Sequence, residues 1–523
     1  MTAAVESNIV SRLADAAARH PDRLAIADAH DRVTFGALRD RVARVGGGLS
    51  ADGVRAGDRV LVFVPMSVDL YVTLLGALHA GAVPVFVDAW ADRRRLAAAV
   101  RAAAPVAFIG SRRASLLRLF SGEVRRIPRA YLPGSAALTR RAGGAPAAVE
   151  PDAPALVTFT TGSTGAPKAA ERTHAFLLAQ HRALAAHLAA RDDDVDMPTL
   201  PVFVLSNLAL GIPSVIPDAD PRRPADIDPR RVHGQMVREG VTTSSGSPAF
   251  YERLAAWCER TGESLPLRAL FTGGAPVLPP LARRLQAVVR GRGRGTAHVV
   301  YGSTEAEPIA GITADEMVAL DGLTDGVCVG RPVPDIRLRL IRPHDAPIEL
   351  SDSGWTTWDV EGGPGEIVVA GAHVLRGYVG DPDADRRNKI PDGNIVWHRT
   401  GDAGRLDPDG RLWLLGRVRE RVLRDGVEWW PLPAEVRALR VEGVTHAAYV
   451  GASDATRGKR AVLVVEADPR RADELRPVLQ RALDPWPLDE LRVVKRIPRD
   501  PRHASKTDLE RLRREVGLGG ETR

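Results

Sequence analysis

Short apolar runs alternate with longer amphipathic segments in the first third of the chain. The runs are rich in β-branched and aromatic residues, and they lie at residues 58–66, 83–89, 106–110 and 155–160. Residues 67–80 and 93–105, which separate them, have the spacing and composition of helices. Strands that alternate with helices predict parallel sheets covered by helices, and therefore an α/β fold.

Beyond residue 320 the pattern changes to short strands separated by glycine or Asp-Gly turns. Examples are GEIVVAGAHVLRGY (365–378), GRLDPDGRLWLLGR (404–417) and ERVLRDGVEWW (420–430). We expect a large N-terminal domain, residues 1–416, with mixed or parallel helix-covered sheets and a β-rich subdomain. A small mobile α+β domain is expected over 417–523. Residues 133–155, rich in Ala, Gly and Pro, are interpreted as an exposed linker or an inserted loop.

Composition narrows the class of protein. A chain of 523 residues is too long for one core, and its 44% apolar and 26% charged residues are typical of folded globular proteins. The net charge of +7 comes from arginines interleaved with acids along the whole chain, without a nucleic-acid-binding motif. We therefore expect no nucleic-acid partner. Only Cys258 and Cys328 are present, which excludes a disulfide framework and a cysteine zinc site.

The N-terminus has early acidic residues and no uninterrupted apolar core, so it does not resemble a signal peptide. The most apolar stretch, residues 67–89, contains Asp69, His79 and Pro84 and is better explained as helix, turn and strand than as a membrane span. We expect a cytoplasmic protein without a membrane span.

A loop rich in glycine and hydroxyl residues, TTGSTGAPK (160–168), follows the fourth strand. Glycines let backbone N–H groups converge on a phosphate, and hydroxyls and a lysine meet the remaining oxygens. Pro167 before Lys168 excludes the common nucleotide-triphosphatase pattern, and no G-x-G-x-x-G or G-x-S-x-G motif is present in the loop. Taken alone, the loop is either a phosphate cradle or a surface linker.

Four further segments follow in order: TGGAPV (272–277), YGSTE (301–305), TGD with GR (400–417), and PRDPRHASK (498–506). Together with the loop they resemble the motifs of the adenylate-forming superfamily, which includes acyl-CoA synthetases, peptide-synthetase adenylation domains and luciferases. The resemblance covers residues 20 to 515. It departs from the superfamily at Ser505, where glycine is usual.

The resemblance implies a nucleotide site for ATP and Mg²⁺. Its nucleotide-binding residues would be Thr160, Thr161, Gly162, Ser163, Thr164, Gly165, Gly273, Gly274, Ala275, Pro276, Tyr301, Gly302, Ser303, Asp402 and Arg417. An aromatic ring suits a purine face, and a carboxylate such as that of Asp402 suits the two ribose hydroxyls.

The resemblance also assigns catalysis to Lys168, Thr304, Glu305 and Lys506. It assigns metal binding to Glu305 and Thr164, and it places a hinge between domains at Arg419. Magnesium prefers hard carboxylate oxygens, and an ammonium group can offset charge at the α-phosphate. The implied reaction is attack of a carboxylic acid, the small-molecule partner, on the α-phosphate of ATP, giving acyl-AMP and pyrophosphate.

Our prediction for the second half-reaction rests on positions where the sequence departs from the usual pattern of acyl-CoA synthetases. Phe203 is followed by Val204, where acyl-CoA synthetases commonly have histidine. The segment GVEWWPLPAEV places Trp429 and Trp430 where a thiol channel would run; the two indoles either obstruct that channel or pack in a core.

These features, with DADPRRPADIDP (218–229), CVGRPVPDIRLRLI (328–341), KIPDGNIVWHRTGD (389–402) and DPRHASK (500–506), resemble the olefin-pathway β-lactone synthetases. The resemblance implies a long-chain 2-alkyl-3-hydroxy acid whose own hydroxyl attacks the activated carbonyl, so that no external thiol is needed.

The predicted acyl pocket includes apolar residues that are also spaced as core residues would be. It comprises Phe203, Val204, Ser206, Asn207, Gly246, Ser247, Ala306 and Glu307. Glu307 either assists removal of the hydroxyl proton or takes part in a salt bridge.

Two other functions stay open: a ligase that loads CoA or a carrier protein, and an inactive basic protein that retains a nucleotide fold. A pathway-enzyme partner is also open, and the sequence gives no oligomeric state.

Overall fold

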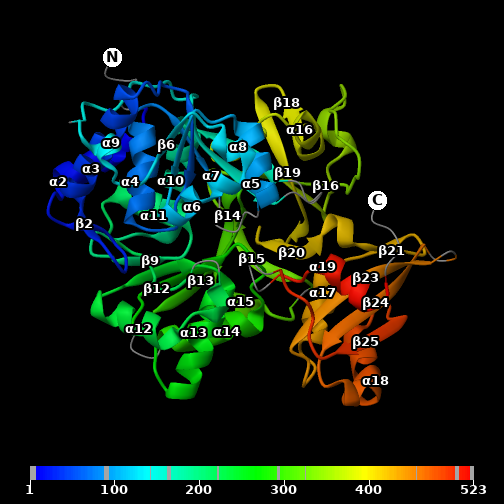
Figure 1. The fold of residues 1–523 in the computed structure, drawn as a ribbon. Coiled ribbons are helices and arrows are strands. Elements are labelled where there is room, and N and C mark those ends of the chain that lie inside the picture. Colours follow the sequence, from blue (N-terminus) through cyan, green and yellow to red (C-terminus); the bar gives the residue numbers. More distant parts are fainter. Residues whose placement is uncertain are drawn as a thin grey trace.

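The computed structural model describes residues 7–87, 93–141, 143–161, 167–220, 223–290, 295–323, 325–454, 456, 458–500 and 506–518. Three sheets, of six, fourteen and five strands, carry the fold. Helices cover the sheets, and the C-terminal part of the chain forms a separate lobe beside the rest (Figure 1). In the described residues no helix combines the length and apolar character needed to cross a membrane.

The six-stranded sheet confirms the predicted alternation of strands and helices. Its order is β6-β5-β3-β4-β7-β8, parallel except for the final β7–β8 hairpin. The strands are β3 (Arg59–Phe63), β4 (Val83–Phe86), β5 (Ala107–Gly110), β6 (Arg129–Tyr131), β7 (Pro154–Thr161) and β8 (Pro167–Thr173). The associated helices are α2 (Val10–Arg19), α3 (Phe35–Ala51), α4 (Val68–His79), α5 (Arg93–Ala103), α6 (Arg112–Ser115), α7 (Leu117–Phe120), α8 (Gly122–Arg125) and α9 (Ala136–Thr139).

Residues 133–155, interpreted as an exposed linker or an inserted loop, have many exposed side chains but pack on the fold at several points, which favours the inserted loop. Leu138 of α9 is buried and α9 packs on α3, where Gly48 has no side chain and so leaves room for the Leu138 backbone. Ala147 N donates to the His79 carbonyl at 2.8 Å. The segment is therefore a packed part of the fold whose small residues permit close approach of backbones.

The fourteen-stranded sheet joins a parallel half to an antiparallel half. The parallel half follows the order β1, β10, β9, β11, β12, β13. β2 pairs antiparallel with β1, and pairing is antiparallel from β13 onward. The strands are β1 (Leu24–Ala27), β2 (Arg32–Thr34), β9 (Asp196–Pro198), β10 (Ser214–Val215), β11 (Thr243–Gly246), β12 (Ala269–Gly273), β13 (Thr296–Ser303), β14 (Ala306–Thr313), β15 (Val327–Pro332), β16 (Arg337–Ile341), β17 (Gly365–Ala370), β18 (Lys389–Asp392), β19 (Ile395–Leu406) and β20 (Leu412–Arg417).

Helices α10 to α16 belong to the same stretch of chain. They are α10 (His174–Leu188), α11 (Pro201–Leu210), α12 (Pro229–Arg238), α13 (Pro248–Thr261), α14 (Pro279–Arg290), α15 (Ala314–Leu320) and α16 (Pro382–Asn388), with 3-10 turns η1 (Pro224–Asp226) and η2 (Gly354–Thr357). The change to antiparallel strands confirms the β-rich region expected beyond residue 320.

The third sheet is built entirely from residues after Arg417. It contains β21 (Val422–Arg424), β22 (Val427–Trp429), β23 (His446–Asp454), β24 (Gly458–Glu466) and β25 (Glu490–Val494), with α17 (Pro431–Ala438), α18 (Ala472–Leu483), α19 (Leu509–Glu515), η3 (Val418–Glu420) and η4 (Pro469–Arg471). Asp425 and Gly426, both at positive φ, form the β21–β22 turn, as the Asp-Gly pair predicts. The functional division of the chain at 416/417 stays a prediction.

Ion pairs connect this lobe to the antiparallel part of the large sheet. Arg437 of α17 lies 2.9 Å from Asp325, and Arg440 lies 2.6 Å from Asp321. These contacts hold α17 beside β15 and α15 in the arrangement seen in Figure 1.

Candidate active site

Lys168 lies on β8, directly opposite Thr160 of β7. Residues 162–166, which include the predicted Gly162, Ser163, Thr164 and Gly165, lie outside the described residues, and of Thr160 and Thr161 only the backbone is described. Lys168 itself is buried, with 7% of its surface exposed, and its ammonium lies 5.1 Å from the centre of the Tyr378 ring. Burial lowers the pKa of Lys168, while the charge of Glu305 opposes that change.

Glu305 occupies the turn between β13 and β14. Its carboxylate Oε1 accepts a 2.9 Å hydrogen bond from the Tyr378 hydroxyl, and its carbonyl accepts one of 2.7 Å from Leu375 N. Tyr378 is placed there by its bridge to Ala170 of β8. One tyrosine therefore links the predicted metal ligand to the strand that carries Lys168.

A second buried lysine, Lys389, approaches the same tyrosine. Its ammonium lies 5.3 Å from the Tyr378 ring centre, donates to the Leu375 carbonyl and is 3.3 Å from His398 Nδ1. Burial lowers the pKa of Lys389 to about 7, against the opposing charges of Glu305 and Asp385. We call Lys168, Glu305, Tyr378 and Lys389 the lysine cluster.

Sequence reasoning assigned no role to Tyr378 or Lys389. For Lys389 the sequence offers one signal: it begins KIPDGNIVWHRTGD, a stretch that resembles the olefin-pathway β-lactone synthetases. A lysine next to an isoleucine at the start of a β segment is a reason to look for an anionic partner.

Thr304 is exposed, and its backbone is fixed by Arg172. The Arg172 guanidinium donates to the Thr304 carbonyl at 2.8 Å and to Thr158 Oγ1 at 2.6 Å. Burial lowers the pKa of Arg172 to about 10. This arginine, which the sequence reasoning also missed, ties the β7–β8 hairpin to the turn that carries Glu305.

At the other end of the site, Asp402 is bound by two side chains. Its Oδ2 accepts a 2.8 Å hydrogen bond from the Tyr301 hydroxyl, and its Oδ1 lies 3.1 Å from Arg417 Nε. Asp402 and Arg417 are direct partners in the β19–β20 register. Burial and the charge of Asp402 raise the pKa of Tyr301 well above its usual value, and Asp402 also raises the pKa of Arg417. We call these three residues the Asp402 cluster.

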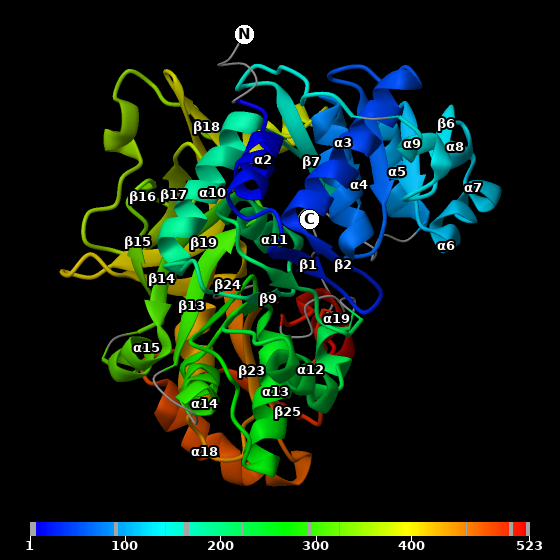
Figure 2. The same ribbon diagram turned by 90° about the vertical axis from the view of Figure 1, so that its left-hand side faces the viewer.

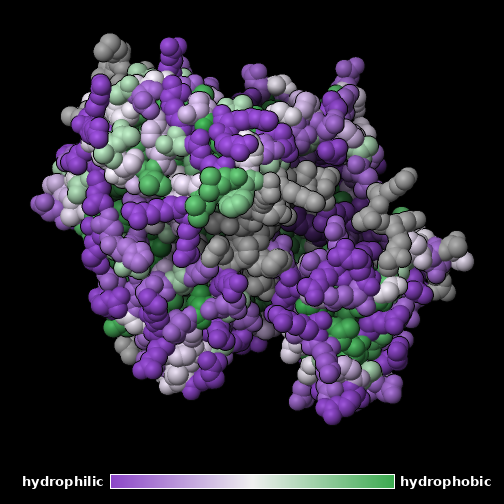
Figure 3. All heavy atoms as spheres, viewed as in Figure 1, coloured by the Kyte–Doolittle hydropathy of each residue, from purple (hydrophilic) through white to green (hydrophobic). Residues whose placement is uncertain are grey.

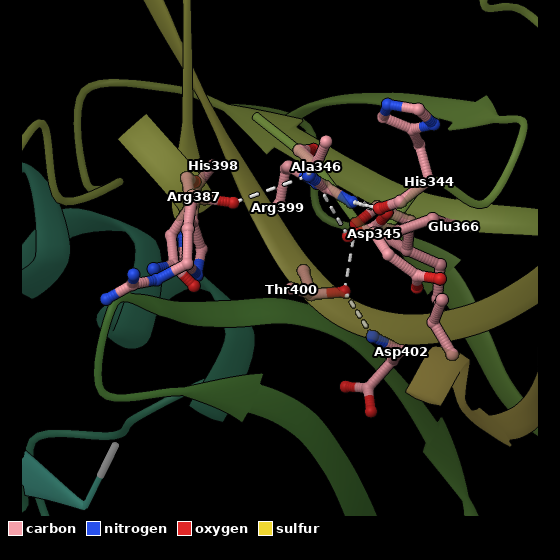
Figure 4. Close-up of polar contacts among 12 residues, drawn as sticks. His344, Asp345, Ala346, Glu366, Arg387, His398, Arg399, Thr400 and Asp402 are labelled. Atoms are coloured by element: carbon pink, nitrogen blue, oxygen red, sulfur yellow. Dashed lines mark hydrogen bonds and ion pairs between the residues drawn. The ribbon is translucent and has the colours of Figure 1, made fainter. Parts of the chain in front are cut away.

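Strand β19, which carries Asp402, is fixed by a buried ion pair (Figure 4). Arg399 Nη2 lies 2.6 Å from Glu366, and the two side chains are 8% and 2% exposed. The guanidinium also donates to the carbonyls of His344 and Ala346. The neighbouring Thr400 hydroxyl donates to the Ile367 carbonyl at 2.9 Å and accepts from Asp402 N at 3.0 Å. Charged pairs this well hydrogen-bonded fix strand position, so they set the direction of the Asp402 side chain.

The predicted nucleotide-binding residues 273–276 and 301–303 lie on or directly after two neighbouring strands, β12 and β13. Gly273 ends β12 and pairs with Val300, next to Tyr301 on β13. A Cβ on Gly273 would lie 2.4 Å from the Val300 carbonyl oxygen, and Gly274 has a φ of +77°. Only glycine fits these two positions. Ala275 and Pro276 continue the loop after β12. A Cβ on Gly302 would approach the Ala306 carbonyl, and Ser303 Oγ accepts from Glu305 N at 3.3 Å.

Several residues of the predicted acyl pocket are packed in the interior of the fold. Phe203 packs with Phe271 and Val300, and Val204 is fully buried in the adjoining core. The Asn207 amide donates to Asp196 at 2.8 Å and to Ser214 at 3.1 Å. A lining role for these residues stays a prediction.

Other predicted pocket residues present polar groups. Ser206 Oγ lies 3.2 Å from His181 Nδ1, and the buried Ser247 Oγ has no hydrogen-bond partner in the described part of the chain. Gly246 leaves space that Thr199 fills. Ala306 begins β14 and bridges to Val374.

Glu307 follows on β14, and its side chain is half-buried. The backbone carbonyl accepts a hydrogen bond from Gln180, but within the described ranges no ion pair or hydrogen bond of the Glu307 carboxylate is found. Burial raises the pKa of Glu307 to about 7, although Arg172 opposes this. The salt-bridge alternative for Glu307 therefore has no support among the described residues.

Lys506 directly precedes the bridge between Arg499 and Thr507, and its carbonyl accepts from Asp500 N at 2.8 Å. A pocket lies between this segment and η1, lined by Arg223, Pro224 and Asp226 and by Arg499, Asp500 and Arg511. The catalytic role of Lys506 stays a prediction. Arg419, the predicted hinge residue, lies in η3 and pairs with Glu420 at 3.2 Å.

Both tryptophans of GVEWWPLPAEV pack on protein. Trp430 is buried among Ala403, Leu415 and Val418, and Trp429 forms an edge-to-face pair with Trp486 at 5.7 Å between ring centres. These contacts favour the core-packing alternative for the two indoles, and whether they also exclude a thiol stays untested.

Comparison with known proteins agrees with this arrangement. Residues 13–379 match the AMP-binding enzyme family. The chain is 33% identical to an olefin beta-lactone synthetase of Stenotrophomonas maltophilia, over 97% of each chain. It is 34% identical to an olefin beta-lactone synthetase of Xanthomonas campestris pv. campestris, over 79% of each chain.

Solved structures share the fold. The amide bond synthetase McbA of Marinactinospora thermotolerans superposes with a TM-score of 0.82 at 23% identity, covering 98% of this chain and 99% of that one. ATP-bound MatB of Rhodopseudomonas palustris gives a TM-score of 0.80 at 24% identity, with the same coverage. The α/β fold with a large N-terminal part is therefore the expected one, and the chain is an ATP-dependent, AMP-forming ligase that belongs to the AMP-binding enzyme family.

Proposed function

We propose that this enzyme converts a long-chain 2-alkyl-3-hydroxy acid and ATP into a β-lactone, AMP and pyrophosphate. The two olefin beta-lactone synthetases to which it is similar support the choice of product. The observation that carries the proposal is the position of the Glu307 carboxylate, which lies on β14 two residues from Glu305 and has no ion pair in the described chain.

In the first half-reaction, a carboxylate oxygen of the acid attacks the α-phosphorus of ATP. The bond from that phosphorus to the bridging oxygen breaks, and pyrophosphate leaves with the electron pair. We assign Lys168 and Lys506 to the negative charge that moves toward pyrophosphate, since ammonium groups aimed at developing charge lower the barrier. Tyr301 would hold the adenine, and Asp402 with Arg417 the ribose and phosphate.

The donor set around Glu305 suits magnesium. Oε1 accepts from Tyr378, which orients the carboxylate and leaves Oε2 available. One carboxylate with substrate phosphates is a common magnesium site. Glu305 would hold the ion together with Thr164, and the ion would supply charge neutralisation at the phosphates.

In the second half-reaction, the substrate's 3-hydroxyl oxygen attacks the acyl carbonyl carbon. The carbon–oxygen bond to the phosphate of AMP breaks, and AMP leaves with the electron pair. The hydroxyl proton passes to the Glu307 carboxylate, because a base with a pKa near the working pH is suited to that transfer. Both reacting groups belong to one molecule, so holding its chain in place favours ring closure.

We further propose that residues 417–523 act as a lid on the 1–416 core, with Arg419 at the hinge and Lys506 delivered by the lid. Asp402 of β19 pairs with Arg417, the last residue of β20, two positions before Arg419. Rotation at Arg419 would therefore leave both residues in the large sheet.

Incubation with Mg-ATP and a 2-alkyl-3-hydroxy acid, without CoA, tests the function. We expect a product lighter than the acid by one water, a β-lactone carbonyl in the infrared spectrum, and one AMP per lactone. The matched 2-alkyl acid that lacks the hydroxyl should support pyrophosphate exchange but give no lactone. A product that requires CoA or a carrier protein, or an adenylate that accumulates without closing, would overturn the proposal.

A further inference from the structure

An apolar surface lies on α6 and α7, remote in sequence from the candidate site. Leu116, Leu119 and Phe120 are 56%, 67% and 65% exposed. Leu116, between the two short helices, has helical backbone angles of −65° and −24°, so α6 and α7 continue one another. At spacing i, i+3 and i+4 the three side chains share one face.

Other side chains of α6, α7 and the chain that follows them already fill the core. Ala114, Val124 and Ile127 are buried in the cluster that contains Val157 and Ala169 of β7 and β8, and Leu117 packs against it. The three outward residues are therefore not core residues of the described structure. Figure 3, viewed as Figure 1, shows a hydrophobic patch over α6 and α7, and large exposed apolar patches mark interaction surfaces.

Positive charge surrounds the apolar patch. Residues 111–129 hold six arginines and one acid, Glu123. Glu123 is already engaged by Arg101 at 2.8 Å and by the Ser121 hydroxyl. Arg112, Arg113 and Arg125 are exposed, and none of them forms an ion pair with the part of the chain that is described. The segment therefore favours an anionic partner.

The shape selects among anionic partners. Figure 2 shows α6, α7 and α8 together at one outer edge of the molecule, where they project away from the sheets. A projecting apolar tip flanked by arginines suits the interface of a bilayer, into which the apolar side chains insert while guanidinium groups meet lipid phosphates. A second copy of this chain would bring like charges together.

We propose that residues 111–129 bind the surface of an anionic lipid bilayer through Leu116, Leu119 and Phe120 and the arginines around them. The contact is peripheral, and it goes beyond the proposed lactone formation, on which it does not depend.

Flotation of the full-length protein with vesicles tests the proposal. Vesicles of phosphatidylcholine alone are compared with vesicles that contain about one third phosphatidylglycerol, at about 50 and about 300 mM NaCl, because salt screens charge attraction. We expect binding to the anionic vesicles at low salt, and at least about tenfold weaker binding for a Leu119→Ser/Phe120→Ser variant and for an Arg112→Gln/Arg113→Gln/Arg125→Gln variant.

Leu323→Ser and Arg470→Gln are the matched controls, because both side chains are exposed on other parts of the surface. They should bind vesicles as the wild type does. Circular dichroism and pyrophosphate exchange show that each variant is folded, and neither readout requires lactone formation. Wild-type protein that does not float with anionic vesicles, as expected if an acidic protein is the partner, would overturn the proposal, as would unchanged binding by the Leu119→Ser/Phe120→Ser variant.

Discussion

The lysine cluster and the Asp402 cluster lie at two ends of the candidate nucleotide site and hold their charges differently. Asp402 accepts from Tyr301 and pairs with Arg417, whose side chain is 51% exposed. Lys168 and Lys389 are buried against one tyrosine ring, and burial lowers the pKa of both. One end has its charges paired before ligand arrives, whereas the other holds two buried lysines whose charged forms are disfavoured by burial.

This difference predicts different contributions to the reaction. A paired carboxylate positioned by its strand gains little more when charge moves during the reaction, so the Asp402 cluster should act mainly in nucleotide binding. Buried cations are costly until an anion approaches. They should therefore interact most strongly as negative charge builds up on pyrophosphate, which lowers the activation barrier.

Lys168→Met should have the largest effect. We expect kcat for pyrophosphate exchange to fall about a thousandfold, as expected for loss of a donor aimed at developing charge. The KM for ATP should change much less. Lys168→Arg keeps a charge with different geometry and should recover part of the rate. A rise in KM with kcat preserved would remove the distinction between the two ends.

Glu307→Gln should have the next largest effect, and it tests the acyl side of the candidate site, next to Glu305 of the lysine cluster. Because the pKa of Glu307 is raised to about 7, the base gains activity as pH rises through that value. Lactone formation by the wild type should increase over this range, and the variant should show a flat profile about a hundredfold lower at alkaline pH. Pyrophosphate exchange, which precedes lactone formation, should persist. The same pH profile in both proteins would exclude Glu307 as the base.

Asp402→Ala should weaken ATP binding by about tenfold to a hundredfold, the usual range for charge-assisted hydrogen bonds. Its kcat at saturating ATP should stay within a few-fold of the wild type. Glu366→Gln is the companion variant, because it weakens the Arg399 pair behind the strand without touching the Asp402 side chain. Calorimetric titration with a non-hydrolysable ATP analogue gives both affinities. Unchanged affinity in Asp402→Ala would count against the ribose assignment.

Much of the fold was accessible from sequence, because the signals for it are local. Strand and helix periods predicted four strands of the six-stranded sheet, β3, β4, β5 and β7, but not β6 or β8. The Asp425-Gly426 turn predicted the β21–β22 hairpin. A further exception was 133–155. Its small residues left an exposed linker and an inserted loop open, and the structure favours the loop, because Gly48 and Gly143 allow backbones to approach too closely for a Cβ. Composition does not reveal which small residues lie at a tight contact.

The residues of the candidate site also divide into those that the sequence identified and those that it did not. Lys168, Glu305 and Asp402 each belong to a short motif, so their residue types and spacing identified them as candidates. Tyr378 and Lys389 belong to no such motif. Tyr378 reaches the site because the segment after β17 crosses β14 and β8, as the bridges Ala306–Val374 and Ala170–Tyr378 record. Lys389 reaches it on β18, which pairs with β19. Contacts between segments so far apart in sequence follow from tertiary packing, which residue periodicity does not report.

Lys389→Met has the smallest expected effect, and it tests whether the charged form of Lys389 destabilises the folded protein. Folding lowers the pKa of Lys389 from 10.5 to about 7. Between these values the unfolded chain binds one more proton than the folded one, so this lysine makes wild-type stability rise with pH. From pH 7 to pH 9, wild type should gain about 1 to 3 kcal/mol of stability relative to the variant. Denaturant unfolding at the two pH values measures the gain.

Lys495→Met, which removes an exposed lysine of the C-terminal lobe, controls for the loss of one positive charge. It should keep the pH dependence of the wild type. If wild type and Lys389→Met instead respond to pH in parallel, Lys389 keeps its proton in the folded enzyme, and its charge must be compensated by Glu305 and Asp385. The lysine cluster would then be as fully paired as the Asp402 cluster, and the contrast between the two ends would have to rest on Lys168 alone.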